Sequence, residues 1–127
     1  MSYKNYNANP TGKHVGDCTV RAVSKALGCC WEEAYAGLIA EGYLYKDMPS
    51  ANRVWGAYLR RKGFKRKSIP DEFSDYYTVV DFCNDYPKGT YVLALDRHVI
   101  CIIDGDYYDT WDSGKEAPIY YWTKEET

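Results

Sequence analysis

The amino-acid sequence predicts one α+β domain, in which a helical half (residues 17–86) packs on a small antiparallel β-sheet (residues 90–123). Apolar residues recur at helical spacing through the first region, whereas the second holds short apolar runs separated by turn residues. The 127 residues suffice for one packed core without disulfide or metal staples. Residues 1–16 then form an N-terminal arm, and a functional cleft is expected between the two halves.

The first predicted helix carries a cysteine at its start. Asp17 or Thr19 can act as the N-cap, and Gly28 is a stop signal. One apolar face carries residues at i, i+3 and i+7: Val20, Val23 and Leu27. Cys18 therefore lies in or beside the first turn, where free backbone N–H groups and the helix dipole favour the reactive thiolate. Such a cysteine is either a nucleophile or a buried side chain that only packs.

Further helices are expected before the sheet. The segment after Gly28 places apolar residues at helical period: Trp31, Ala34, Leu38 and Ile39. Ser50 can cap a second amphipathic run over residues 54–59. Thr78 and Asp81 resemble a capping box, so a short fourth helix is expected to begin there and to end before Pro87.

The second half of the chain predicts a hairpin. Residues 91–95 and 98–103 are apolar runs that indicate two antiparallel strands. Asp104-Gly105 is a two-residue type I′ turn signal, and residues 106–111 form the return strand. Residues 118–122 are expected to form a last strand.

The register of this hairpin selects one carboxylate as a partner for a histidine. The two-residue turn pairs Ile103 with Asp106, and this places His98 and Asp109 on the same face of the sheet. Diagonal neighbours of this kind lie about 7–8 Å apart at the backbone, within reach of long side chains. Asp112 falls on the opposite face, so Asp109 is the better orienting acid.

The ordered set of Cys18, His98 and Asp109 resembles the papain-like cysteine peptidases. In that family a nucleophile begins a central helix, a histidine follows on a later strand, and an Asn or Asp on the next strand lies in an Asn-Ser-Trp pattern similar to residues 109–111. The resemblance implies that Cys18 is the nucleophile, that His98 is first base and then acid, and that Asp109 orients the imidazole. It also implies that Trp111 shields the His–Asp hydrogen bond from water.

The resemblance is to the minimal members, because the chain is shorter than papain and lacks the residues that surround the papain cysteine. Residues 17–19, Asp-Cys-Thr, and His98-Val99 are similar to the NlpC-type cell-wall peptidases. The third residue of those enzymes is usually a histidine, whereas this chain has Asp109. The order Asp-Cys-x-x-Arg-Ala also resembles small papain-like proteins of bacteriophages.

One part of the family pattern is missing. Papain-like peptidases carry a glutamine six residues before the nucleophile, where its side chain helps to form the oxyanion hole. Gly12 occupies that position here. Polar residues of the arm are the available replacements, and Asn9, just before Pro10, is preferred as the oxyanion donor. The alternative is that residues 5–10 are only a polar, flexible arm.

Cysteine spacing and hydropathy exclude several classes of protein. The five cysteines include no Cys-x-x-Cys pair, so neither a zinc site nor a disulfide framework is expected, and no cofactor is implied. Cys83 and Cys101 are expected to pack in the core. No apolar stretch is long enough to span a membrane and no leader pattern is present, which predicts no membrane association and a cytoplasmic location.

Two surface features bear on partners. Residues 60–67 hold six cations in eight positions, and such a run either contacts phosphates or acidic groups or forms a solvated helix end. Nucleic-acid binding is disfavoured, since the net charge is −2 and no groove-reading motif accompanies the run. Some of the 14 tyrosines are expected to line a cleft or a partner surface. The oligomeric state stays open.

Three functions remain open from the sequence. The first is hydrolysis of a peptide or isopeptide bond in a protein or peptide substrate by a Cys–His–Asp triad. The second is transglutaminase-like acyl transfer, in which an amine replaces water. The third is a non-catalytic binding protein on a papain-like scaffold, such as a phage factor that acts on a host protein.

Overall fold

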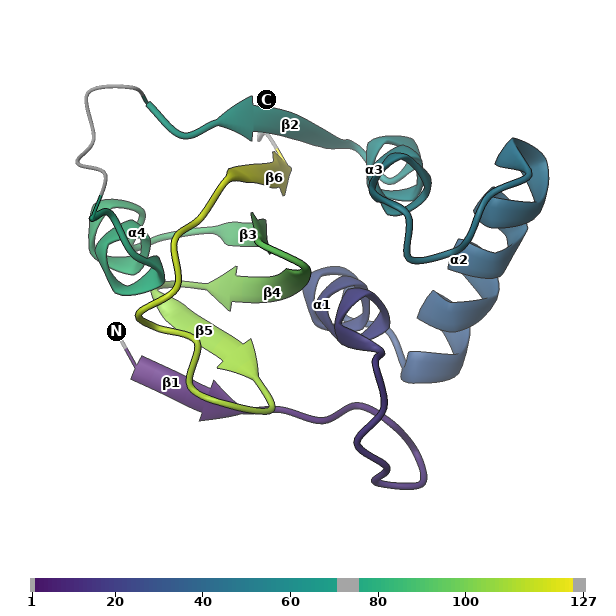
Figure 1. Cartoon of the computed structure of the whole chain (residues 1–127), viewed down its shortest axis with the longest axis horizontal. Helices are drawn as coiled ribbons and strands as arrows, with labels where there is room; N and C mark the ends of the chain where they lie inside the picture. Colours follow the sequence, from purple (N-terminus) through teal and green to yellow (C-terminus); the bar gives the residue numbers. More distant parts are fainter. Residues whose placement is uncertain (1, 71–75, 125–127) are drawn as a thin grey trace.

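The computed structural model describes residues 2–70 and 76–124, and in this part of the chain helices and strands form an α+β fold (Figure 1). The helices are α1 (Cys18–Leu27), α2 (Trp31–Tyr45), α3 (Asn52–Arg61) and α4 (Val79–Asp85). The strands are β1 (Ser2–Asn5), β2 (Phe64–Ser68), β3 (Thr90–Leu95), β4 (His98–Ile103), β5 (Asp106–Asp109) and β6 (Tyr120–Lys124).

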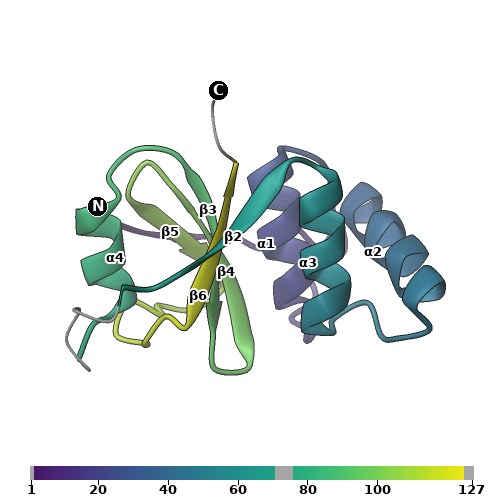
Figure 2. The same ribbon diagram turned by 90° about the horizontal axis from the view of Figure 1, so that it is seen from above.

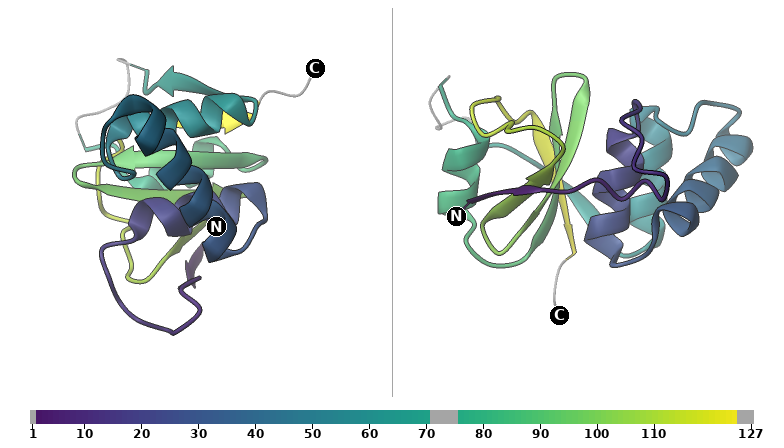
Figure 3. Two further views of the ribbon diagram at one scale, coloured as in Figure 1. Left: turned by 90° about the vertical axis from the view of Figure 1, so that its right-hand side faces the viewer. Right: turned by 90° about the horizontal axis from the view of Figure 1, so that it is seen from below.

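The elements form layers around one sheet. Figure 2 shows α4 on one face of the sheet, α1 and α3 on the other, and α2 outermost beyond them. The strand order is β1-β5-β4-β3-β6-β2. Figure 3 shows that the segment between β1 and α1 leaves the sheet and passes along the helical layers before α1 begins.

The sheet is mixed, which corrects the predicted antiparallel sheet. Ser2–Asn5, expected to be part of an arm, forms an edge strand parallel to β5. The Tyr3 ring packs against the Tyr107 ring at 5.7 Å, and this aromatic contact anchors the strand. Phe64–Ser68, expected as part of the helical half and of a solvated helix end, forms the opposite edge beside β6. Phe64 is buried while the rest of β2 is exposed, and charged side chains on an edge strand oppose pairing with other chains.

The predicted helices are confirmed, with small differences at their ends. Gly28 ends α1 in the left-handed conformation at φ 66°, which glycine adopts without steric cost. The capping box of Thr78 and Asp81 is present at the start of α4. Ala51 rather than Ser50 is the N-cap of α3.

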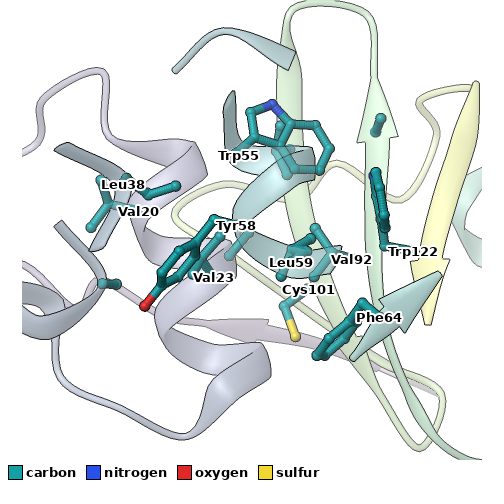
Figure 4. Close-up of a cluster of buried hydrophobic side chains, with 14 residues drawn as sticks. Val20, Val23, Leu38, Trp55, Tyr58, Leu59, Phe64, Val92, Cys101 and Trp122 are labelled. Atoms are coloured by element: carbon teal, nitrogen blue, oxygen red, sulfur yellow. The ribbon is translucent and has the colours of Figure 1, made fainter. Parts of the chain in front are cut away.

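Two apolar cores hold the layers together. The larger core lies between the sheet and α1, α2 and α3, and Figure 4 shows Trp55, Leu59 and Trp122 in its centre. The smaller core packs Phe82 and Cys83 of α4 against the other face of the sheet. Because α1 packs chiefly on β4, the first residue of α1 lies close to the first residue of β4.

Within the described residues, no helix combines the length and the apolar character needed to cross a membrane.

Candidate active site

Cys18 is the first residue of α1 and is partly buried. Asp17 occupies the N-cap position, but its side chain makes no capping hydrogen bond. The Asp17 carboxylate instead accepts a hydrogen bond of 2.9 Å from the Trp31 indole N–H. The first-turn N–H groups of α1 are therefore left uncapped by a side chain, and their dipoles favour a negative charge at the thiol.

His98 lies between Cys18 and a carboxylate. It is the first residue of β4, and its Nε2 lies 2.6 Å from Asp109 Oδ2. The ring also hydrogen-bonds the Cys18 side chain. Since Nε2 faces Asp109, the nitrogen that faces the thiol is Nδ1.

Cys18 and His98 shift each other's pKa. Burial raises the pKa of Cys18, but hydrogen bonds from the His98 ring and the Val99 backbone N–H outweigh it, and the net pKa lies below the ordinary range. Burial lowers the pKa of His98, whereas its hydrogen bonds with Asp109 and Cys18 raise it to about 9. Both shifts favour a thiolate–imidazolium pair near neutral pH.

Asp109 ends β5 and is held by several donors. The predicted register is confirmed, because Ile103 pairs with Asp106. The Asp109 carboxylate is buried and accepts hydrogen bonds from the Thr110 backbone N–H at 2.8 Å and the Ser113 hydroxyl at 2.7 Å. Asp112 lies apart from the imidazole and accepts a hydrogen bond of 2.6 Å from the Tyr107 hydroxyl.

Arg21 is a buried cation of the site that sequence reasoning left without a role. Its Nε lies 3.4 Å from Asp17 Oδ1 and its Nη2 lies 3.9 Å from Asp109 Oδ1. Nη1 donates to the Thr110 hydroxyl at 3.3 Å. The guanidinium therefore links Asp17, the residue before Cys18, to Asp109. The signal in the sequence is the i, i+4 spacing of Asp17 and Arg21.

Trp111 and Asn9, the two residues expected to support the Cys–His–Asp set, lie in different places. The Trp111 ring lies 5.0 Å from the His98 ring, so it covers the imidazole from one side. The Asn9 side-chain oxygen accepts hydrogen bonds from the backbone and the hydroxyl of Thr11, at 2.9 and 2.7 Å. Asn9 lines a neighbouring groove and is absent from the lining of the cleft that holds Cys18 and His98. The structure thus does not bring Asn9 to the expected oxyanion position.

A cleft of about 540 Å³, named here the Cys18 cleft, opens beside the thiol. Its walls come from the start of α1, the start of α3 and the β3–β4 hairpin, and among the described residues of its lining Asn52 carries the one side-chain amide. The Asn52 side-chain oxygen accepts a hydrogen bond of 3.1 Å from the Trp55 indole N–H. The amide N–H₂ group of Asn52 is therefore its end that can donate to a ligand.

The buried cysteines differ from Cys18 in environment. Burial raises the pKa of Cys83 to about 11 and also raises the pKa of Cys101. Both side chains pack in the cores, as expected. In residues 2–70 and 76–124, no group of three or more His, Cys, Asp and Glu side chains is arranged to hold a metal ion.

Comparison with protein-family models, with curated proteins and with solved structures found no match in any of the three sets.

Proposed function

We propose that the chain is a cysteine hydrolase that cleaves peptide or isopeptide bonds through an acyl-enzyme at Cys18. The single observation that carries this proposal is the position of the His98 ring, which hydrogen-bonds both the Cys18 thiol and the Asp109 carboxylate. A buried structural cysteine needs no such partners. The charged pair they favour is the resting state of a thiol nucleophile.

In the proposed reaction the Cys18 thiolate attacks the substrate carbonyl carbon and forms a C–S bond, with the negative charge on the carbonyl oxygen. As the C–N bond breaks, the proton on His98 Nδ1 goes to the leaving amine. Water then attacks the thioester and gives a proton to neutral His98. Cleavage of the C–S bond releases the carboxylic acid and restores the pair.

The supporting groups fit this sequence of steps. Asp109 keeps Nδ1 of His98 directed at the thiol, and Arg21 balances the buried carboxylate. We assign oxyanion stabilisation to the Cys18 backbone N–H and to the Asn52 amide, because Asn52 lines the Cys18 cleft and Asn9 does not. The order of helix-start cysteine, strand histidine and acid on the next strand is that of the papain-like peptidases, and we propose membership of that superfamily.

The test is selective alkylation. Iodoacetamide at pH 6 should modify Cys18 before the other four cysteines, and His98→Ala should abolish this preference because the hydrogen bond and charge that favour the thiolate are lost. Cys30 is the matched control, since it is exposed but has no histidine partner in the described structure. Equal rates at Cys18 and Cys30 in the wild type would contradict the nucleophile assignment.

A further inference from the structure

The Cys18 cleft borders a second groove at the start of α1. This groove of about 380 Å³, named here the Trp31 groove, shares Gly16, Thr19 and Ser50 with the Cys18 cleft. The three shared residues are small, so the two hollows are neighbours with no bulky side chain among the residues that border both. A chain whose carbonyl lies at Cys18 can therefore extend into the Trp31 groove without passing over a bulky side chain.

The Trp31 groove is apolar and its aromatic wall is fixed. The Trp31 and Tyr35 rings stack at 4.7 Å and 11°, and the Trp31 N–H is held by Asp17. Val15 and Tyr35 also line the groove and are 50% and 42% exposed. The only charged side chain among its described lining residues is Asp17. Its carboxylate already accepts a hydrogen bond from Trp31 and pairs with Arg21. Such a site suits an aliphatic or aromatic side chain.

The apolar surface goes on along the outer helix. A third groove, of about 470 Å³, is lined by the apolar residues Ile39, Tyr43 and Met48 and by the charged residues Lys46 and Asp47, and it shares Pro49 with the Trp31 groove. Tyr35, Ile39 and Tyr43 are spaced by four residues, so they form one stripe about 12 Å long on α2. The stripe is open to solvent, because all three of its side chains are exposed, and α2 is the outermost layer in Figure 2. We name it the α2 stripe.

We infer that the substrate is a polypeptide whose segment on one side of the scissile bond carries apolar side chains, bound in the Trp31 groove and along the α2 stripe. This inference rests on the proposed function. An extended chain rises about 3.3 Å per residue, so about four residues cover the stripe and more are needed to reach Cys18. A small ligand fills one of these grooves, whereas the continuity of all three matches the length of an extended peptide.

The experiment selects a randomised dodecapeptide library on the Cys18→Ala variant. Recovered peptides should be enriched in aliphatic and aromatic residues, and Tyr35→Ser and Ile39→Ser/Tyr43→Ser should each raise their Kd by about tenfold through lost apolar contact. Leu44→Ser is the matched control, since Leu44 is a 62% exposed residue of α2 that lines none of the three grooves. It should leave the Kd unchanged.

Three results would overturn the inference. The first is that no peptide is recovered. The second is that the groove variants leave the Kd for the recovered peptides unchanged. The third is that the serine variants of the α2 stripe break a self-dimer in sedimentation without altering peptide affinity. Iodoacetamide alkylation of Cys18 in the Ile39→Ser/Tyr43→Ser variant serves as the separate readout of the active site. Absence of selective alkylation in the wild type contradicts the proposed function. Failure to recover any peptide on the Cys18→Ala variant, while the wild type is still alkylated selectively at Cys18, contradicts only the substrate assignment.

Discussion

At the scale of single residues, His98 is held at both ring nitrogens, and its pKa should set the upper limit of the active pH range. The Cys18 pKa is lowered, so a larger fraction of Cys18 is thiolate at pH 6 than of an ordinary thiol of pKa about 8.5, which is about 0.3% ionised there. The His98 pKa is raised to about 9, so the imidazolium, which is the proposed proton donor to the leaving amine, is lost as pH rises through about 9. Peptide turnover should fall at low pH, where the Cys18 thiolate becomes protonated, and again above about pH 9. Initial rates from pH 4 to 10 measure this pH profile. A rate that still rises between pH 9 and pH 10 would contradict a catalytic imidazolium.

The two candidate acids should differ in effect. Asp109→Asn removes the charge that raises the His98 pKa, so the Cys18 pKa rises and alkylation at pH 6 slows by about tenfold per pKa unit. Asp112→Asn should leave the rate nearly unchanged, because Asp112 bonds Tyr107 and Gly114 instead of His98. Alkylation rates of the two variants give the comparison. Equal slowing would mean that Asp112 also acts on the imidazole.

The sequence predicts the positions of Cys18, His98 and Asp109 because helix capping and hairpin register are local. The Asp104-Gly105 turn fixes which acid shares a face with the histidine, and both turn residues have positive φ in the structure. The role of Arg21 depends on α1 packing beside the end of β5, and no local pattern reports that packing. Asn52 lies on a separate helix and lines the Cys18 cleft only through tertiary packing, so no local pattern predicts its position either.

At the scale of elements, α3 approaches β6 closely at a helical glycine. A Cβ at position 56 would lie 2.8 Å from the Trp122 ring. Gly56→Ala should therefore destabilise the fold. Overpacking costs about 1–3 kcal/mol, which exceeds the gain of about 1 kcal/mol that alanine has over glycine in a helix. Urea unfolding measures the change. The same substitution in a Trp122→Phe background should cost less, and an equal cost in both backgrounds would place the strain elsewhere.

The helices were predictable from periodicity and caps, but the two edge strands were not. β1 has only Tyr3 as an apolar residue, so its sequence carries no alternation. β2 is charged after Phe64, and a basic run beside a helix end has the same composition as solvated surface. Both strands form because they add to a sheet whose central strands are built from the buried runs of β3 and β4.

At the scale of the whole molecule, the N-terminal strand supports the site from the opposite end of the chain. The Asp109 carbonyl accepts hydrogen bonds from the Tyr6 backbone N–H at 2.8 Å and from the Tyr3 hydroxyl at 3.2 Å. Removal of residues 1–5 should therefore lower both the urea midpoint and the rate of Cys18 alkylation at pH 6. Lys4→Ala, an exposed change in the same strand, is the control and should alter neither. A truncated chain that keeps both properties would show that β1 is dispensable.

The parallel pair of β1 and β5 joins Ser2–Asn5 to Asp106–Asp109, segments separated by nearly the whole sequence. Contacts of such long sequence separation form late, because loop closure costs entropy before the contact rewards it. During synthesis Cys18 leaves the ribosome long before His98 and Asp109 do. The thiol of a nascent or C-terminally broken chain therefore lacks the partners that ionise it, and the proposed activity is acquired only on completion of the sheet.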